Sequence, residues 1–189
     1  MAAPALTAGT RVFEMGPHMK TTRTVTVLVG IWVLGWLASG CGKPRKEISE
    51  RDRKEAAMLA SEAQFAINLR EWARAESLLD RTVRLAPNAD TWVALGSARV
   101  RLGNKSGAKA AYQQALRAFE DEAAVEEKRV EPWLGQITVL ALLGKADASR
   151  ALVAKAAKRF PNDARLKSLV DPKQFEAMLA DPGFRENAL

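Results

Sequence analysis

The stretch TWVALGSARVRLGNKSGAKAAYQQALRAFE, from Thr91 to Glu120, decides the fold. Its apolar residues recur at the three- and four-residue spacing of an amphipathic α-helix, both before and after the triplet Leu102-Gly103-Asn104. Gly103 stands where the first helix has to stop, and glycine readily adopts the left-handed conformation that commonly ends a helix. The stretch therefore predicts two helices joined by a tight turn.

The same plan occurs twice more in the chain, at residues 63–88 and 132–162. Gly144 takes the place of the turn glycine in the later copy, and Arg70 fills that place in the earlier copy. Each copy contains one amphipathic helix, a turn and a second helix. Together they predict an all-α solenoid of about three helix-turn-helix repeats over residues 51–162.

These residues resemble the tetratricopeptide repeat (TPR), whose motif runs Trp-x2-Leu-Gly-x2-Tyr, then Ala-x3-Phe, then Pro. The middle copy has Arg99 in place of the motif tyrosine and Glu120 in place of the proline. Its matching residues are Trp92, Leu95, Gly96, Ala108 and Tyr112. The other copies match less fully, through Trp72, Ala75, Leu79 and Pro87 in the first and Trp133, Ser149, Val153 and Pro161 in the third. We interpret the three tryptophans as packing residues of the core.

The spacing of the repeats is uneven. Ala75 and Ala108, the small residues at equivalent positions of two second helices, are 33 residues apart, close to the usual TPR period of about 34. Ala108 and Ser149 are 41 residues apart, and the excess equals about two helical turns. We therefore expect residues 111–131 to form one overlong helix, and a flexible insertion is the alternative.

Residues 163–189 are predicted to cap the stack, because the last repeat of a solenoid otherwise exposes an apolar face. Two Asp-Pro pairs in this segment are able to end or start a helix. The residues expected to cover the open end are Leu166, Leu169, Phe175, Met178, Leu179 and Phe184.

The chain begins with the three-part layout of a secretory signal. A short basic segment precedes an uncharged apolar run at residues 25–37, which is shorter than the roughly 20 residues of a membrane span. We interpret residues 1–40 as a signal peptide. Residues 1–18 lie upstream of a complete signal, and our hypothesis is that translation starts at Met19 or Met15.

The sequence LASGC at residues 37–41 resembles the lipobox of bacterial lipoproteins, with Ala38 where leucine is commoner. In that family the cysteine sulfur receives a diacylglycerol group, and the signal is cut before the cysteine. The resemblance makes Cys41 the lipid attachment point and residues 41–50 a linker. Gly42 implies export to the outer membrane, since an aspartate there implies retention in the inner membrane. An uncleaved signal anchor with an unmodified cysteine is the alternative.

Cleavage before Cys41 leaves a chain without histidine, because His18 is the only one. Catalysis by histidine and metal sites built from His and Cys are then excluded, and we expect neither a metal nor a cofactor. The formal net charge of +7 suits acidic partners or anionic headgroups, and equally a solvated helical surface. Nucleic acid is not an expected partner, because basic residues alternate with acidic ones and the signal directs the chain out of the cell.

The resemblance implies that the first helices of the repeats line a concave groove that binds a peptide. The residues expected to face this groove are Gln64, Asn68, Asp90, Val93, Ser97, Arg101, Leu134 and Thr138, together with Val100. The chain is then a non-enzymatic, lipid-anchored scaffold on the periplasmic side of the outer membrane, which binds other envelope proteins and assists assembly of an envelope complex. Two alternatives stay open, an adaptor anchored in the inner membrane and a cell-wall-acting enzyme that uses a carboxylate.

Overall fold

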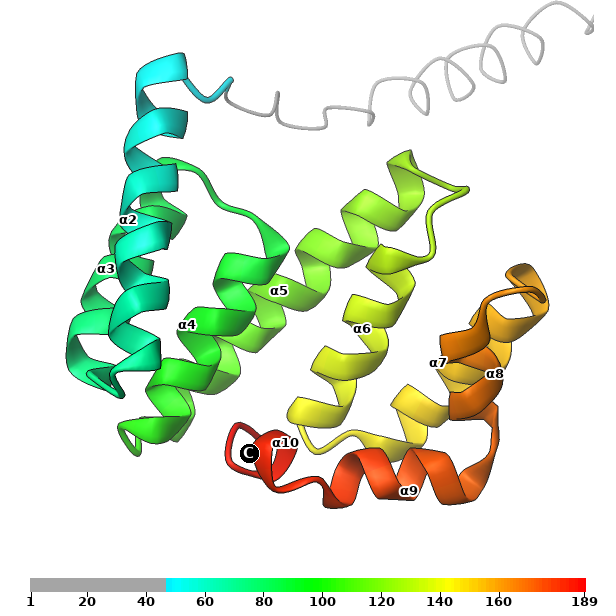
Figure 1. Cartoon of the computed structure of the whole chain (residues 1–189). Helices are drawn as coiled ribbons and strands as arrows, with labels where there is room; N and C mark the ends of the chain where they lie inside the picture. Colours follow the sequence, from blue (N-terminus) through cyan, green and yellow to red (C-terminus); the bar gives the residue numbers. More distant parts are fainter. Residues whose placement is uncertain (1–46) are drawn as a thin grey trace, which may run out of the picture. The chain divides into compact units, whose positions relative to one another are not determined.

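The structure is a computed structural model that describes residues 47–189. These residues form a TPR-like α-solenoid of three helix pairs followed by three short helices, with no strand in this part of the chain (Figure 1). The pairs are α2 (Glu50–Asn68) with α3 (Trp72–Leu85), α4 (Ala89–Arg101) with α5 (Lys105–Val125), and α6 (Glu131–Leu142) with α7 (Ala146–Arg159). The short helices are α8 (Ala164–Val170), α9 (Pro172–Ala180) and α10 (Pro182–Arg185). The predicted fold class is confirmed.

The predicted signal peptide, the proposed start at Met19 or Met15, and Cys41 lie outside the described residues. Helix α2 begins directly after Ser49, whose side chain accepts a hydrogen bond from the main-chain N–H of Asp52 and so caps the helix. Among the helices of residues 47–189, none is long and apolar enough to cross a membrane.

The three helix pairs share one turn geometry. Arg70, Gly103 and Gly144 have φ angles of 59°, 75° and 72°. The N–H of each bonds to the carbonyl three residues earlier, and the N–H of the following residue reaches back five residues. This is the Schellman pattern, in which a left-handed residue closes a helix. The prediction of a left-handed residue at all three turns is confirmed, including the unfavourable one at Arg70.

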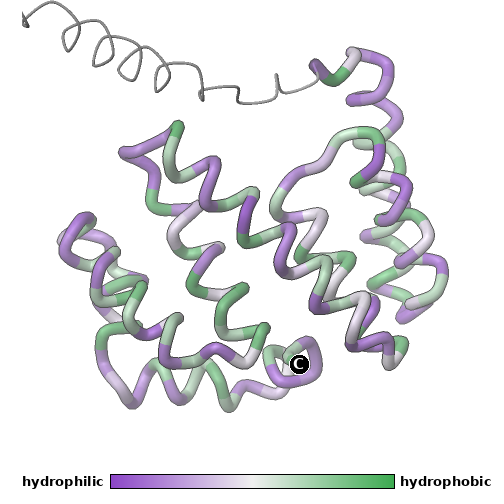
Figure 2. The backbone as a smooth tube through the Cα atoms, turned by 180° about the vertical axis from the view of Figure 1, so that it is seen from behind, coloured by the Kyte–Doolittle hydropathy of each residue, from purple (hydrophilic) through white to green (hydrophobic). Residues whose placement is uncertain are grey.

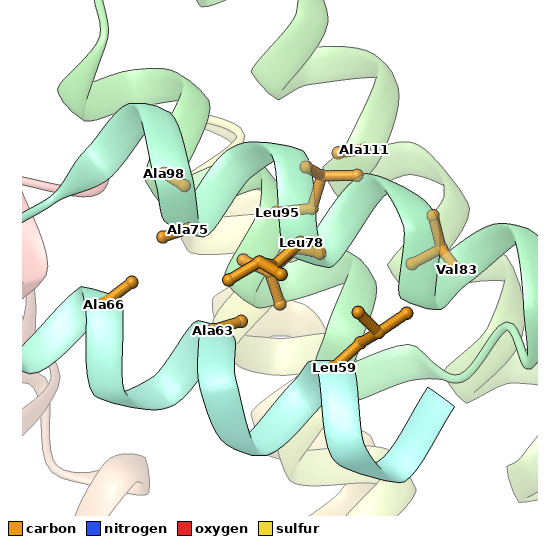
Figure 3. Close-up of a cluster of buried hydrophobic side chains, with 10 residues drawn as sticks. Leu59, Ala63, Ala66, Ala75, Leu78, Val83, Leu95, Ala98 and Ala111 are labelled. Carbon is orange, nitrogen blue, oxygen red and sulfur yellow. The ribbon is translucent and has the colours of Figure 1, made fainter. Parts of the chain in front are cut away.

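Alanines bring the helices of the first two pairs close together. The first core cluster joins α2, α3, α4 and α5, and Figure 3 shows its methyl groups pointing between the helices. Five of its members are alanines that are at most 1% exposed: Ala63, Ala66, Ala75, Ala98 and Ala111. A methyl group lets two backbones approach closely while still excluding water. Hydrophobic and hydrophilic stretches alternate along the helices in Figure 2, as expected for amphipathic helices.

Helix α5 carries the extra length of the second repeat. It has 21 residues, whereas α3 and α7 have 14 each, so the seven additional residues are helical. The expected overlong helix is thus confirmed against a flexible insertion. Its predicted end was wrong, however, because α5 stops at Val125 and α6 begins at Glu131 with Pro132 in its first turn. Proline is common in the first turn of a helix, because the N–H groups of that turn have no intrahelical acceptor and the missing N–H of proline costs no hydrogen bond.

The short helices α8 and α9 pack on the last helix pair, whereas α10 packs elsewhere. Leu166 of α8 and Phe175 of α9 are fully buried against Ile137, Val153 and Ala156 of the last pair. Leu169, Met178 and Leu179 pack against the same residues, which we call the third cluster.

Phe184 of α10 does not join this cluster, and its predicted place at the open end was wrong. It packs instead against a second core cluster built from α4, α5 and α6. The reason lies in Asp181, which ends α9 in an extended conformation (φ −57°, ψ 129°) and accepts a hydrogen bond from the N–H of Phe184. The chain therefore turns back toward α4 and α6, where the last residues lie in Figure 1.

Candidate functional site

The groove residues predicted from the sequence separate into two sets. Gln64 and Asn68 are exposed on α2 and bond to each other, with the Gln64 amide donating to Asn68 Oδ1 at 3.1 Å. Asp90 is exposed in the first turn of α4. Leu134 packs against the third cluster, and Thr138 is half-buried. These five residues are not brought together around one feature.

Of the remaining predicted residues, Arg101 contacts residues 182–189, which we call the tail segment. Ser97 bonds to the Tyr112 hydroxyl, which itself bonds to this segment. Val93 and the neighbouring Val100 pack against the second core cluster, as do Phe184, Ala188 and Leu189 of the tail segment. The sequence prediction placed these side chains in a groove but assigned no segment of this chain to it.

Arg101 forms the polar rim of this contact. Its guanidinium makes an ion pair with Glu186 and donates from Nε to Asn187 Oδ1 at 3.4 Å. The same guanidinium lies over the ring of Trp72, 5.0 Å from the centroid. A cation over an aromatic face is attracted by the ring and is held in place. Trp72 is therefore a support for Arg101 on the preceding helix pair, in addition to the packing role predicted for it.

Tyr112 is the buried polar centre of the contact. Its side chain is fully buried, and its hydroxyl donates to the main-chain carbonyl of Asn187 at 2.6 Å. Ser97 Oγ lies 3.2 Å from the same hydroxyl. A phenol has a single O–H, so Ser97 has to be the donor in this second hydrogen bond. Burial raises the pKa of the Tyr112 hydroxyl above its ordinary value, and the Ser97 hydrogen bond and the charge of Arg101 oppose the rise.

Gly96 leaves room for the Tyr112 ring, because it has no side chain. A Cβ atom at this position would lie 2.4 Å from Cε1 of Tyr112, a distance that no packed side chain reaches. The motif glycine thus lets the aromatic ring lie directly on the backbone of α4. The hydroxyl then reaches past α4 to the tail segment.

Helix α6 contributes through its main chain. The N–H of Leu189 donates to the carbonyl of Leu142 at 3.0 Å, and both side chains belong to the second cluster. This carbonyl lies in the last turn of α6, where carbonyls lack intrahelical partners. A main-chain carbonyl such as that of Leu142 cannot be identified as a binding group from a sequence motif.

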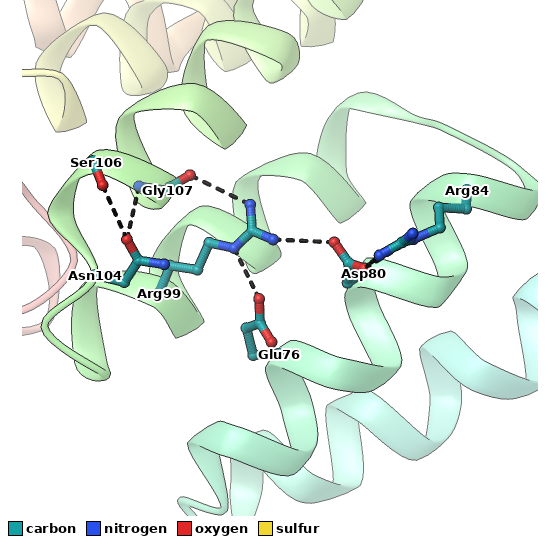
Figure 4. A network of polar contacts seen from close by, with 7 residues as sticks. All are labelled: Glu76, Asp80, Arg84, Arg99, Asn104, Ser106 and Gly107. Atoms are coloured by element: carbon teal, nitrogen blue, oxygen red, sulfur yellow. Dashed lines mark hydrogen bonds and ion pairs between the residues drawn. The ribbon is translucent and has the colours of Figure 1, made fainter.

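Arg99 organises a separate polar network, shown in Figure 4. Its guanidinium donates to Glu76 at 2.9 Å, to Asp80 at 3.0 Å and to the carbonyl of Gly107 at 3.4 Å. The arginine at the motif tyrosine position therefore ties α3 to α4 and α5. Glu76 and Asp80 are both engaged by this cation.

Within residues 47–189, no group of three His, Cys, Asp or Glu side chains is arranged to hold a metal ion. The polar groups gathered at the tail segment are a phenol, a serine hydroxyl, a guanidinium and main-chain carbonyls. Such groups bind polypeptide through hydrogen bonds and charge.

Tyr112, Trp72 and Leu142 were missed as site residues. Tyr112 was noted only as a match to the motif phenylalanine and was assigned no role in a site. One signal was available, since it is the only tyrosine in the chain and a buried phenol needs a hydrogen-bond partner. Trp72 and Leu142 carried no such signal, because their roles depend on Arg101 and Leu189, far away in the sequence.

No family model and no curated protein matches this chain. Among solved structures, it is similar to the Arabidopsis OM64 TPR domain at 16% sequence identity. The match covers 67% of this chain and 98% of that chain, with a TM-score of 0.43.

Proposed function

We propose that this protein is a lipid-anchored module that binds other proteins of the bacterial envelope in the groove expected along α2, α4 and α6, the first helices of the three pairs. Cys41 carries the lipid, and the helix pairs stand on the periplasmic side of the outer membrane. There the module assists assembly of an envelope complex without catalysing a reaction.

One observation carries the binding part of this proposal: a segment of polypeptide already lies against α4 and α6. Tyr112 and Leu142 bond to its main chain, and Arg101 pairs with its acidic side chain. Main-chain hydrogen bonds suit any polypeptide, whereas the pockets and charges around them select among sequences. A solenoid of helix pairs offers such a concave surface by construction.

The anchoring part of the proposal rests on the lipobox-like stretch that ends at Cys41. Each methylene that enters the membrane contributes about 0.8 kcal/mol, and one acyl chain alone binds only marginally. A diacylated cysteine supplies two chains, enough for stable attachment.

Metabolic labelling with an alkyne fatty acid tests the anchor. We expect the label on the full chain and its loss in Cys41→Ser, together with release of that variant from the membrane. Separation of the two membranes on a density gradient then tests the location. A Cys41→Ser variant that still sediments with membranes would overturn the anchor, and label in the inner-membrane fraction would overturn the outer-membrane assignment.

Site-specific photo-crosslinking tests the binding surface. Gln64 on the first helix of a pair and Gln113 on the second helix of a pair are both exposed glutamines, so they form a matched comparison. We expect a photoreactive residue at Gln64 to capture envelope proteins in intact cells and the same residue at Gln113 to capture none of them. Equal capture at both positions would contradict binding through the groove.

A further inference from the structure

The tail segment is held on the core by residues distant in sequence, in addition to the local hydrogen bonds of α10. Its contacts to Arg101, Tyr112 and Leu142 join residues 47 to 86 positions apart. Three kinds of contact are present: an ion pair at Glu186, hydrogen bonds to the main chain of Asn187 and Leu189, and apolar packing of Phe184, Ala188 and Leu189. A separate peptide bound in the same groove would use the same set.

The tail segment is only partly buried, with every residue from 182 to 189 exposed or half-buried. None of its residues is fully buried, and Glu186 is 57% exposed in its side chain. By contrast, Phe175 of the preceding helix α9 is fully buried in the third cluster. Segments with few buried apolar contacts open most easily, so the tail segment can leave while α9 stays in place.

The groove would be left with its specific groups exposed once the tail segment leaves. The Tyr112 hydroxyl, the Leu142 carbonyl and the Arg101 guanidinium would lose their bonds to the tail segment. The second cluster would lose the apolar cover of Phe184, Ala188 and Leu189. Unpaired polar groups beside an apolar surface favour a ligand that restores the same bonds.

We propose that this groove binds partner segments that resemble residues 184–189, and that the tail segment is a built-in competitor which leaves before a partner binds. This inference rests on the proposed function. The partner segment has an aromatic residue, a carboxylate two positions later, and a small and a larger apolar residue at the fourth and fifth positions after the aromatic one, as in Phe184, Glu186, Ala188 and Leu189.

Fluorescence anisotropy with a labelled peptide of residues 181–189 tests this proposal. The full chain, purified in detergent, is compared with a variant that lacks residues 184–189. A tethered competitor acts at a high effective concentration, so its removal is expected to tighten peptide binding about tenfold or more. A second variant, Phe184→Ala with Glu186→Lys, keeps the full length and is expected to have the same effect.

Charge reversal tests the orientation of the bound peptide. Arg101→Glu in the shortened chain is expected to weaken peptide binding about tenfold, and a peptide with lysine in place of Glu186 is expected to recover it. Circular dichroism establishes that each variant keeps its helices. Peptide affinity that is unchanged by removal of the tail, or unaffected by Arg101→Glu, would overturn the proposal.

Two further outcomes separate the possible occupants. A full chain that dimerises, and becomes monomeric when residues 184–189 are removed, would show that the tail binds a second copy, and the competitor model would fail. Crosslinking of envelope proteins from Gln64 without any peptide binding would overturn this inference while leaving the proposed function intact.

Discussion

The hydroxyl of Tyr112 donates a hydrogen bond to the main-chain carbonyl of Asn187 at 2.6 Å, across 75 residues of sequence. The phenol is fully buried at the contact of α4 and α5, and the carbonyl belongs to the last residues of the chain. The interior of the second helix pair is therefore linked directly to the tail segment. A substitution of Tyr112 is therefore expected to loosen the tail segment, and removal of the tail segment is expected to change the surroundings of Tyr112.

The first prediction concerns the ionisation of Tyr112. Burial favours the neutral phenol and raises its pKa in the folded protein above the ordinary value of about 10. The folded chain thus keeps a proton that the unfolded chain loses. The associated stability is fully present below about pH 10 and is lost as the pH rises through the folded pKa.

Absorbance of the phenolate measures this pKa directly, because Tyr112 is the only tyrosine in the chain. We expect a midpoint above that of the unfolded chain in denaturant. Ser97→Ala should move the midpoint further up, because the Ser97 hydrogen bond lowers the pKa. Loss of residues 184–189 should move it down by exposing the hydroxyl. A folded midpoint at or below the unfolded one would contradict the burial of this group.

The second prediction concerns the Arg99 network. The Arg99 side chain is only 18% exposed and bonds to Glu76, Asp80 and Gly107. Arg99→Ala leaves two half-buried carboxylates without this cation, and we expect the free energy of unfolding to fall by about 2 kcal/mol. Urea unfolding followed by circular dichroism measures the change.

Arg84 provides the control for that experiment, since it bonds to Asp80 from the exposed surface of the same helix. Arg84→Ala should change stability little, because surface pairs contribute little in water. An equal loss in both variants would mean that the burial of the network is unimportant.

The third prediction concerns the three left-handed turn residues. Arg70 has the same positive φ as Gly103 and Gly144, although its Cβ crowds the backbone there. Arg70→Gly should raise the free energy of unfolding by about 0.5 to 1 kcal/mol, after allowing for the greater freedom of glycine in the unfolded chain.

Gly103→Ala is the reciprocal change. A Cβ at Gly103 would meet nothing within 4 Å, so the substitution tests the backbone conformation alone. We expect a loss of about 1 kcal/mol in thermal or urea unfolding. The free energy of unfolding should rise in Arg70→Gly and fall in Gly103→Ala. A fall in Arg70→Gly would instead show that the Arg70 side chain stabilises the fold.

The fourth prediction concerns the contact of Gly96 with Tyr112. In Gly96→Ala the new methyl group would overlap the Tyr112 ring, which is fully buried. We expect a loss of about 1 to 3 kcal/mol in the free energy of unfolding. In a double-mutant cycle with Tyr112→Leu, the combined loss should be smaller than the sum of the single losses. Additive losses would exclude the overlap as the cause.

The candidate site was only partly predictable. Position within the repeat places Val93, Ser97 and Arg101 on one face of α4, because residues three and four apart share a helix face. The same rule also assigned Gln64 and Thr138 to the groove. It could not predict that the tail segment lies against α4 and α6, because that contact depends on tertiary packing. Tyr112 was interpreted from its motif position alone. Phenylalanine is usual at that position, so the motif gives no information about a partner for the hydroxyl.

The helix pairs and their turns could be predicted from the sequence. Amphipathic spacing and a single left-handed residue are local properties, so Gly103, Gly144 and even Arg70 could be assigned without a partner. The tertiary structure alone decided where residues 182–189 lie. Their positions depend on Tyr112, Arg101 and Leu142, which are 47 to 86 residues away in the sequence and come together only in the folded protein.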